Sequence, residues 1–194
     1  MTGYLIIDTS TRYGAVGLWD GGIERLNAWR SHNNHTAELM PAVDALLQAD
    51  AILPGELMGI VVAIGPGGFS ALRTGLGVAK GLAVGGSLPL VGVSSLEASA
   101  YTYRNAAARI CALLPAGRQT VAWSTYASRG DSWRVLNEER VSSCEEFLAL
   151  QEGQTLFCGE GAGDLETQLL DRLGESALFT DTTPLSRLVG AAEI

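Results

Sequence analysis

The sequence predicts an α/β fold in which short apolar strands and amphipathic helices follow one another. Three observations support this prediction. The chain opens with three strands around a tight turn, a helical spacing of apolar residues follows, and a buried strand then leads through a glycine-rich turn into a second helix. Because α/β proteins place ligands where a strand passes through such a turn into a helix, this turn is a candidate site.

The first three strands are predicted from short apolar runs. Residues 4–7 are apolar and end at Asp8, and residues 13–19 alternate imperfectly before an Asp-Gly-Gly turn. Two such runs joined by a turn of this composition are typical of a β-hairpin. Residues 23–30 continue after the turn as a third strand.

Two helices and a strand follow. Leucine and valine residues over 36–49 recur at i, i+4, i+7 and i+8, which predicts an amphipathic helix. Residues 59–65 predict a buried strand rich in Ile and Val. The turn Gly65-Pro66-Gly67-Gly68 then leads into a second helix over 70–84.

The second helix has three glycines in its interior, Gly75, Gly77 and Gly81. Each costs roughly 0.5 to 1 kcal/mol relative to alanine. Missing side chains let another helix or backbone approach closely, so the helix is interpreted as a packing surface. Two interpretations stay open: a surface for a partner, or a helix packed tightly inside its own domain.

The rest of the chain continues the alternation, and its balance of elements predicts two domains, 1–106 and 107–194. A strand at 89–93 and a helix beginning at Ser94-Ser95-Leu96-Glu97 complete the first. In the second, strands outnumber helices. The predicted strands there are 110–114, 120–128, 132–141 and 155–158, and the predicted helices are 143–150 and 163–173.

The composition limits the function classes. With 194 residues, 47% of them hydrophobic and 18% charged, the chain is expected to fold around a core. The net charge is −8 and Lys80 is the only lysine, which argues against autonomous binding to RNA or DNA phosphates. No stretch reaches the ~20 apolar residues of a membrane span. Because the N-terminus also lacks the features of a secretory signal, we expect a cytoplasmic protein.

The sequence indicates neither a metal site nor a nucleophile. Cys111, Cys144 and Cys158 are odd in number and form no CxxC motif, so we expect free, buried thiols. His32 and His35 stand at the start of the first helix and are expected in a solvated loop. No motif pairs a cysteine with a histidine, and Gly-x-Ser-x-Gly is absent.

Four segments, in the order and spacing of a known family, and a fifth, weaker segment resemble that family. Four lie in the first half and the fifth, weaker match is the Cys-Gly-Glu-Gly-Ala segment. The segments are Leu5–Thr11, Gly65–Gly75, Ala79–Ala83, Val91–Ala98 and Cys158–Ala162. They resemble the TsaB (YeaZ) family of bacterial tRNA threonylcarbamoyladenosine (t6A) biosynthesis. The resemblance implies an actin/Hsp70/sugar-kinase fold of the ribonuclease-H-like type, with two lobes of mixed sheets and flanking helices.

In that fold an acid and hydroxyls on the first hairpin meet the phosphates and metal of ATP. The resemblance therefore places Asp8, Thr9 and Ser10 in a vestigial nucleotide-binding position. Carboxylate and hydroxyl oxygens suit Mg²⁺. Asp-Thr-Ser after a strand is also an ordinary turn, in which these side chains bond their own backbone. Both interpretations stay open.

The related catalytic subunit TsaD carries a His-x-x-x-His pair that binds a metal. A spacing of four places both imidazoles on one helix face. This chain has Ser95 and Ser99 at those positions, and hydroxyls are poor ligands by comparison. We therefore expect no metal, no cofactor and no catalytic residue, as in a pseudo-enzyme.

The resemblance implies a scaffold subunit of the complex that modifies adenosine 37 of tRNA. It would bind and stabilise TsaD as a heterodimer, help recruit the ATPase TsaE, meet tRNA only through the complex, and form a homodimer alone. The candidate interface residues on the two long helices are Leu39, Val43, Leu46, Leu72, Leu76 and Ala83. The alternative for these residues is an intramolecular core. The alternative functions are an active ATP-dependent kinase or hydrolase of the same fold, and an autonomous tRNA binder.

Overall fold

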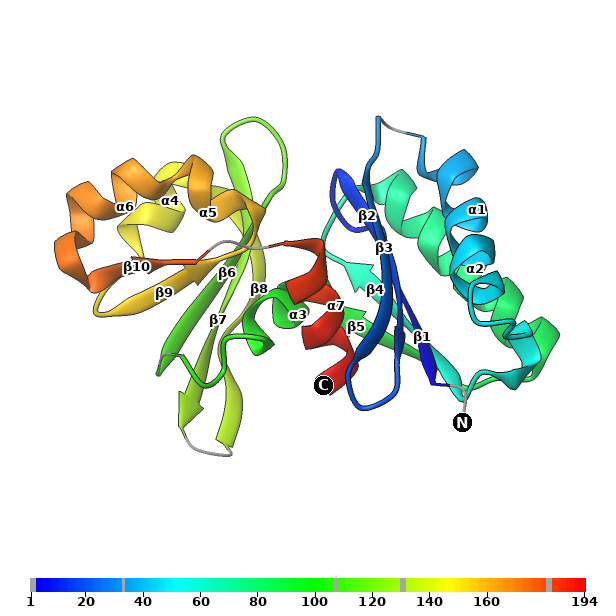
Figure 1. Ribbon diagram of the computed structural model, residues 1–194. Coiled ribbons are helices and arrows are strands. Elements are labelled where there is room, and N and C mark those ends of the chain that lie inside the picture. Colours follow the sequence, from blue (N-terminus) through cyan, green and yellow to red (C-terminus); the bar gives the residue numbers. More distant parts are fainter. Residues whose placement is uncertain (1–2, 33, 107, 130–131, 181–182) are drawn as a thin grey trace. The chain divides into compact units, whose positions relative to one another are not determined.

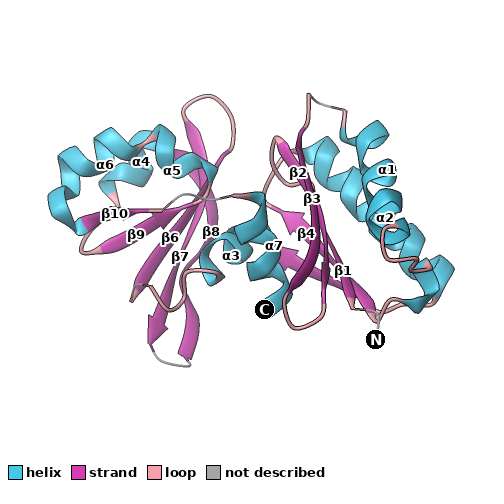
Figure 2. Cartoon of the chain, viewed as in Figure 1, coloured by secondary structure: helices cyan, strands magenta, loops and turns pink. Residues whose placement is uncertain are grey.

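The computed structural model, drawn in Figures 1 and 2, describes residues 3–32, 34–106, 108–129, 132–180 and 183–194. Contacts within the chain define two units. Unit 1 comprises Met1–Ala98 with Thr183–Ile194, and unit 2 comprises Ser99–Thr182. This division differs from the expected lobes 1–106 and 107–194, because the C-terminal segment returns to the first sheet and packs there.

Unit 1 is built on a five-stranded mixed sheet with the order β3-β2-β1-β4-β5. The first three strands pair antiparallel, and β4 and β5 are added in parallel. The strands are β1 (Tyr4–Asp8), β2 (Tyr13–Trp19), β3 (Ile23–Arg30), β4 (Gly59–Gly65) and β5 (Leu90–Ser94). The helical elements are α1 (His35–Gln48), the 3-10 turn η1 (Pro54–Glu56), α2 (Phe69–Gly86) and α7 (Pro184–Glu193), while α3 (Ser95–Tyr101) runs across the boundary between the units.

Both faces of this sheet are covered by helices, which explains why β1 is apolar at consecutive positions. Leu5 and Ile7 point into the core beneath α1 and α2. Ile6 points the other way and packs with Leu188 of α7. Figure 1 shows α1 and α2 on one side of the sheet and α7 on the opposite side. A strand buried on both faces needs no polar alternation.

Unit 2 repeats the same topology, with the order β8-β7-β6-β9-β10 and the same sequence of antiparallel and parallel pairs. Its core packs Trp123, Phe147 and Phe157 edge to face. Figure 2 shows α4, α5 and α6 together beside this sheet. The elements are β6 (Arg109–Pro115), β7 (Thr120–Arg129), β8 (Ser132–Ser143), α4 (Cys144–Ala149), β9 (Thr155–Cys158), α5 (Glu160–Asp164), α6 (Glu166–Leu173), η2 (Gly174–Ser176) and β10 (Ala177–Phe179).

The predicted strands and helices up to Cys158 are confirmed with small shifts at their ends. The helix predicted over 163–173 is instead two helices, α5 and α6, which break at Leu165. The three-residue strand β10 and helix α7 were not predicted. No helix in the described part of the chain is both long and apolar enough to cross a membrane.

Close approach between the loop after β1 and helix α2 requires glycine at two positions. A Cβ atom at Gly67 would lie 2.2 Å from the carbonyl oxygen of Ser10, and one at Gly75 would lie 2.4 Å from the hydroxyl of Thr9. A Cβ atom at Gly77 or Gly81 would meet nothing within 4 Å in the described structure. Intramolecular packing therefore explains Gly75 but not the other two interior glycines of α2.

We expect alanine at two glycines of α2 to have opposite effects on the free energy of unfolding. Gly77→Ala gains helix propensity without a clash and should stabilise the chain by about 0.5 to 1 kcal/mol. Gly75→Ala forces its methyl group onto Thr9 and should destabilise by about 1 to 3 kcal/mol. Urea unfolding followed by tryptophan fluorescence measures both. Equal stabilisation by the two variants would show that Thr9 does not press on Gly75.

Candidate functional site

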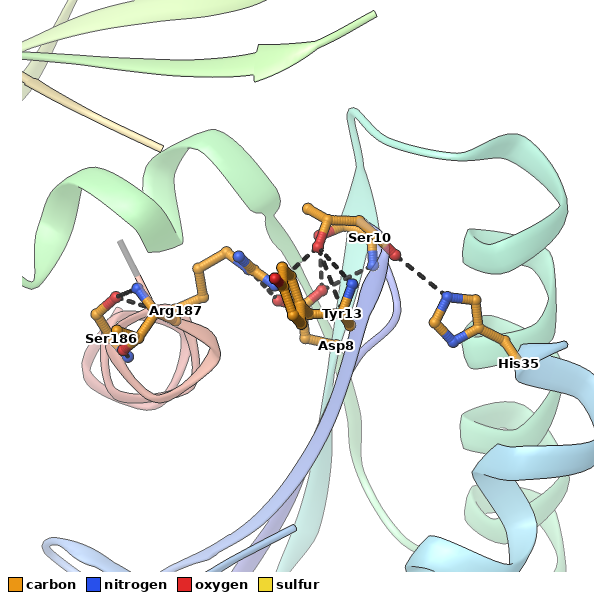
Figure 3. A network of polar contacts seen from close by, with 8 residues as sticks. Asp8, Ser10, Tyr13, His35, Ser186 and Arg187 are labelled. Carbon is orange, nitrogen blue, oxygen red and sulfur yellow. Dashed lines mark hydrogen bonds and ion pairs between the residues drawn. The ribbon is translucent and has the colours of Figure 1, made fainter. Parts of the chain in front are cut away.

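The loop after β1 is a turn that is stabilised by hydrogen bonds to the carboxylate of Asp8 (Figure 3). Asp8, Thr9 and Ser10 are all buried. One oxygen of Asp8, Oδ1, accepts hydrogen bonds from the backbone N–H of Ser10 at 2.8 Å and from its hydroxyl at 2.6 Å. Asp-Thr-Ser is therefore an ordinary turn as far as Oδ1 is concerned, because Asp8 accepts a hydrogen bond from the backbone N–H of Ser10, two residues later in the sequence.

The other oxygen of Asp8 is bound by an arginine from the C-terminal helix. Nε of Arg187 donates to Asp8 Oδ2 at 2.6 Å, and Nη2 of Arg187 donates to the hydroxyl of Thr11 at 3.1 Å. Arg187 is 1% exposed and Asp8 is 3% exposed, so the ion pair is withdrawn from solvent. Figure 3 shows the Arg187 side chain extending from α7 to the loop. Groups of the same chain thus occupy both carboxylate oxygens.

The charge of Arg187 determines the ionisation of Asp8. Burial by itself would raise the pKa of the Asp8 carboxyl. The Arg187 guanidinium and the hydrogen bonds from Arg187 and Ser10 together outweigh burial, and they hold the pKa below its ordinary value of 3.8. Asp8 is therefore a carboxylate at neutral pH, and the ion pair is complete there.

Helix α7 places Arg187 beside Asp8, because the start of the helix is capped and its apolar face packs on the sheet. The hydroxyl of Thr183 accepts from the N–H of Ser186 at 3.2 Å, and the hydroxyl of Ser186 accepts from the N–H of Thr183 at 3.0 Å. Pro184 occupies the first turn, where its missing N–H costs nothing. Leu188 is fully buried beside the sheet. The sequence analysis missed Arg187, although the Thr-Pro start was a usable signal for this helix.

Three further contacts attach the loop to α1 and α2. The hydroxyl of Thr9 donates to the carbonyl of Ala71 at 2.7 Å, and the N–H of Gly68 donates to the carbonyl of Ser10 at 2.9 Å. Nε2 of His35 donates to the carbonyl of Thr11 at 3.2 Å. The loop is therefore fixed on several sides by its own protein.

The expectation of a solvated loop is wrong for His35. Its ring is buried and lies edge-on to Trp29, with the ring centroids 6.3 Å apart. His32 is exposed, as expected. The difference arises because His35 begins α1 and faces inward toward the loop after β1, whereas His32 precedes the helix.

Four of the six predicted interface residues lie in the core of unit 1 instead. They are between 0 and 7% exposed and belong to the cluster beneath the two helices: Leu39, Val43, Leu46 and Ala83. Leu72 and Leu76 are half-buried. The intramolecular alternative is correct for the four buried residues, because a partner could reach them only by opening the core. The outer surfaces of α1 and α2 carry Met40, Phe69 and Val84, which are 44%, 73% and 82% exposed.

Two of the three thiols are buried, as predicted. Burial raises the pKa of Cys111 to about 12, and burial together with neighbouring Cys111 raises the pKa of Cys158 well above its ordinary value. Cys144 is only half-buried. Ser95 and Ser99 are buried on α3. Among the described residues no group of three or more His, Cys, Asp or Glu side chains could hold a metal ion.

The fold is that of the actin/Hsp70/sugar-kinase class, in which one mixed-sheet topology occurs twice. The ROK hexokinase of Thermus thermophilus shares this fold, with a TM-score of 0.54 over 97% of this chain and 96% of the hexokinase, at 12% sequence identity. A family model described as "TsaD: tRNA N6-adenosine threonylcarbamoyltransferase" matches residues 29–168.

Two proteins that are more similar to this chain than the hexokinase indicate a particular family within this fold class. The Escherichia coli K12 protein named "tRNA threonylcarbamoyladenosine biosynthesis protein TsaB" is 33% identical over 163 residues, which span 81% of this chain and 71% of that protein. The structure titled "YeaZ from Pseudomonas aeruginosa" has a TM-score of 0.81 and 26% identity, and the match covers 100% of this chain and 91% of that one. The chain belongs to the TsaB family, within the wider group that the transferase model describes.

Breaking the buried ion pair should strongly destabilise the chain. Arg187→Met leaves the Asp8 carboxylate buried without its partner, and we expect a loss of about 3 to 5 kcal/mol in the free energy of unfolding. The control is Arg25→Met, which removes the exposed ion pair with Asp50 and should cost far less because solvent screens that pair. Urea unfolding at pH 7 compares them. Similar losses in the two variants would contradict the structural role of Arg187.

The lowered pKa of Asp8 also predicts a pH dependence of stability. Because the unfolded state binds the proton more tightly than the folded state, the contribution of Asp8 is complete above its unfolded pKa and is lost as the pH falls through the folded value. We expect Asp8→Asn to be less stable at pH 7 and to lose less stability than wild type between pH 5 and 3. Urea unfolding across that range measures this, and parallel curves would contradict it.

Proposed function

We propose that this chain is a non-catalytic scaffold subunit of the machinery that makes N6-threonylcarbamoyladenosine at position 37 of tRNA. The observation that supports this most concerns Asp8, the acid at the position where kinases of this fold meet ATP: groups of this same chain bind both of its oxygens. Ser10 and Arg187 occupy its two oxygens, and the pair is buried. The names of the TsaB relatives supply the pathway.

The residues at this loop do not fit a magnesium–nucleotide complex. Mg²⁺ requires near-ideal octahedral oxygen coordination and is usually held by one or two carboxylates together with phosphates. Asp8 Oδ1 already accepts two hydrogen bonds from Ser10, and Arg187 pairs with Oδ2, so a magnesium ion would compete with Arg187 for the carboxylate and weaken the buried ion pair. The hydroxyl of Thr9 donates to Ala71, and that of Ser10 donates to Asp8. These contacts support a vestigial role for Asp8, Thr9 and Ser10.

The partner in this proposal is TsaD, bound through the outer surfaces of α1 and α2. Gly77 and Gly81 leave open space on α2, where a second helix could pack closely, and Phe69 and Val84 expose large apolar side chains on the same helix. Close helix contact gains dispersion energy from many small contributions. The family model, described by the name of the transferase, supports a shared architecture of the two subunits.

The remaining roles follow from the same surface. Alone, the chain would use the exposed faces of α1 and α2 to form a homodimer, because exposed apolar patches favour association. In the heterodimer with TsaD it would contribute part of the docking surface for TsaE. Contact with tRNA would come only through the complex, since the net charge of −8 opposes binding to phosphates. The proposed location is the cytoplasm, where tRNA is modified.

Light scattering of the chain mixed with TsaD from the same organism tests the scaffold role. We expect a stable complex whose mass is the sum of the two subunits. Gly81→Tyr fills open space on α2, so it should leave the fold intact and weaken the complex at least tenfold. Gly163→Tyr, which also enters open space but on α5, is the matched control and should bind normally. Absence of a complex, or equal weakening by both variants, would contradict this proposal.

The kinase or hydrolase alternative makes the opposite prediction for nucleotide. Titration of the purified chain with ATP and Mg²⁺ in a calorimeter is expected to give no saturable heat, because Asp8 is already neutralised. Saturable binding that disappears in folded Asp8→Ala would establish the alternative. A salt-sensitive complex with tRNA alone would instead identify an autonomous tRNA binder.

A further inference from the structure

Unit 2 contains a hollow of about 570 Å³, which lies within the size range of small-molecule sites. Its walls come from the turn between β6 and β7, the start of α4, and the junction between α5 and α6. All of the lining residues belong to unit 2. The hollow is therefore a feature of one folded unit, separate from the loop of Asp8.

Short helices border this hollow. In unit 1 the helix that connects the parallel strands β4 and β5 is α2, a continuous helix of 18 residues. Its topological counterpart in unit 2 is interrupted: α5 has only five residues and ends at Asp164, and α6 begins anew at Glu166. Helix α4 has only six residues. The break between α5 and α6 falls at Leu165, which lines the hollow beside the turn between β6 and β7.

The lining combines an apolar floor with acidic groups. Val121 and Leu165 are buried and Leu148 is half-buried, and together they supply apolar surface. Glu145 on α4 and Asp164 at the end of α5 are exposed carboxylates that come from two different helices. Lysine and arginine are absent from the residues that line the hollow. The charged side chains in the lining therefore repel an anion and attract a cation.

Neutral oxygen acceptors complete the lining. The side chains of Gln119, Thr120, Ser143 and Gln168 offer carbonyl or hydroxyl oxygens around the same space. An alkylammonium group has three N–H donors and no acceptor, so one carboxylate and neighbouring neutral oxygens can satisfy it together. A methylene chain between two such groups matches the apolar floor.

We propose that this hollow binds an aliphatic polyamine, with its methylene chain on Val121, Leu148 and Leu165 and its ammonium groups paired with Glu145 and Asp164. Charge complementarity selects a cation, and the apolar floor selects one with a hydrocarbon body over a simple metal ion. The inference does not depend on the scaffold role, because the hollow lies in unit 2 and uses none of the residues proposed to bind TsaD.

Calorimetric titration of the full chain with spermidine tests the site. We expect saturable binding of one molecule, weakened at least tenfold in Glu145→Gln/Asp164→Asn. The control Glu152→Gln/Asp171→Asn removes the same charge from exposed positions outside the hollow and should bind as wild type does. No saturable binding, or equal weakening in both double variants, would overturn the proposal, since the latter would mean diffuse attraction to an acidic protein.

A cysteine in the lining gives a second readout. Cys144 lines the hollow and is half-buried, whereas Cys111 and Cys158 are fully buried, so a thiol reagent should modify Cys144 first. Spermidine is expected to slow modification by N-ethylmaleimide at least fivefold in wild type and not in Glu145→Gln/Asp164→Asn. The variant Cys144→Ser, which lacks this thiol, shows how much of the measured modification occurs at Cys144. Equal protection in both proteins, or none in wild type, would overturn the proposal.

Discussion

The buried ion pair between Asp8 and Arg187 is the interaction on which the first unit most depends. It joins the end of the first strand to the last helix across 179 positions of sequence. A charge removed from water is tolerated only when it is paired and hydrogen-bonded, so each residue requires the other. The pair therefore fixes α7 to the sheet of unit 1, where Leu188 also packs with Ile6. It also explains why a division of the chain into two consecutive lobes is wrong for its last residues.

The same ion pair limits which atoms of the loop after β1 are available to bind a metal ion or a phosphate. A loop that recruits a nucleotide needs oxygen atoms that are free to bind metal or phosphate. Here the carboxylate of Asp8, the hydroxyl of Thr9 and the carbonyl of Ser10 all have partners within the chain. Gly67 and Gly75 allow α2 to approach so closely that these bonds can form. Hydrogen bonds within the chain and bonds to a ligand would use the same oxygen atoms. In this structure the hydrogen bonds within the chain are formed.

The sequence predicted most of the elements because their signals are local. Strand β1 is a short apolar run, and α1 has apolar residues at helical spacing. The same spacing misled the choice of interface residues. Periodicity shows which side of a helix is apolar but not whether that side meets a partner or its own sheet, and Leu39 and Val43 meet the sheet side of the core. Arg187 could not be assigned as the partner of Asp8, because a contact between the two ends of a chain leaves no local signal.

The two units show how one topology can yield different sites. Strand order and pairing are the same in both, so the difference lies in how the helices fill the space above each sheet. In unit 1 the long helix α2, with glycine at its closest contacts, closes over the loop of Asp8. In unit 2 the corresponding segment is divided at Leu165 into α5 and α6, and a hollow lined by apolar and acidic side chains lies beside this break. The two units therefore share their strand order and differ in the continuity of the helix that connects their last two parallel strands.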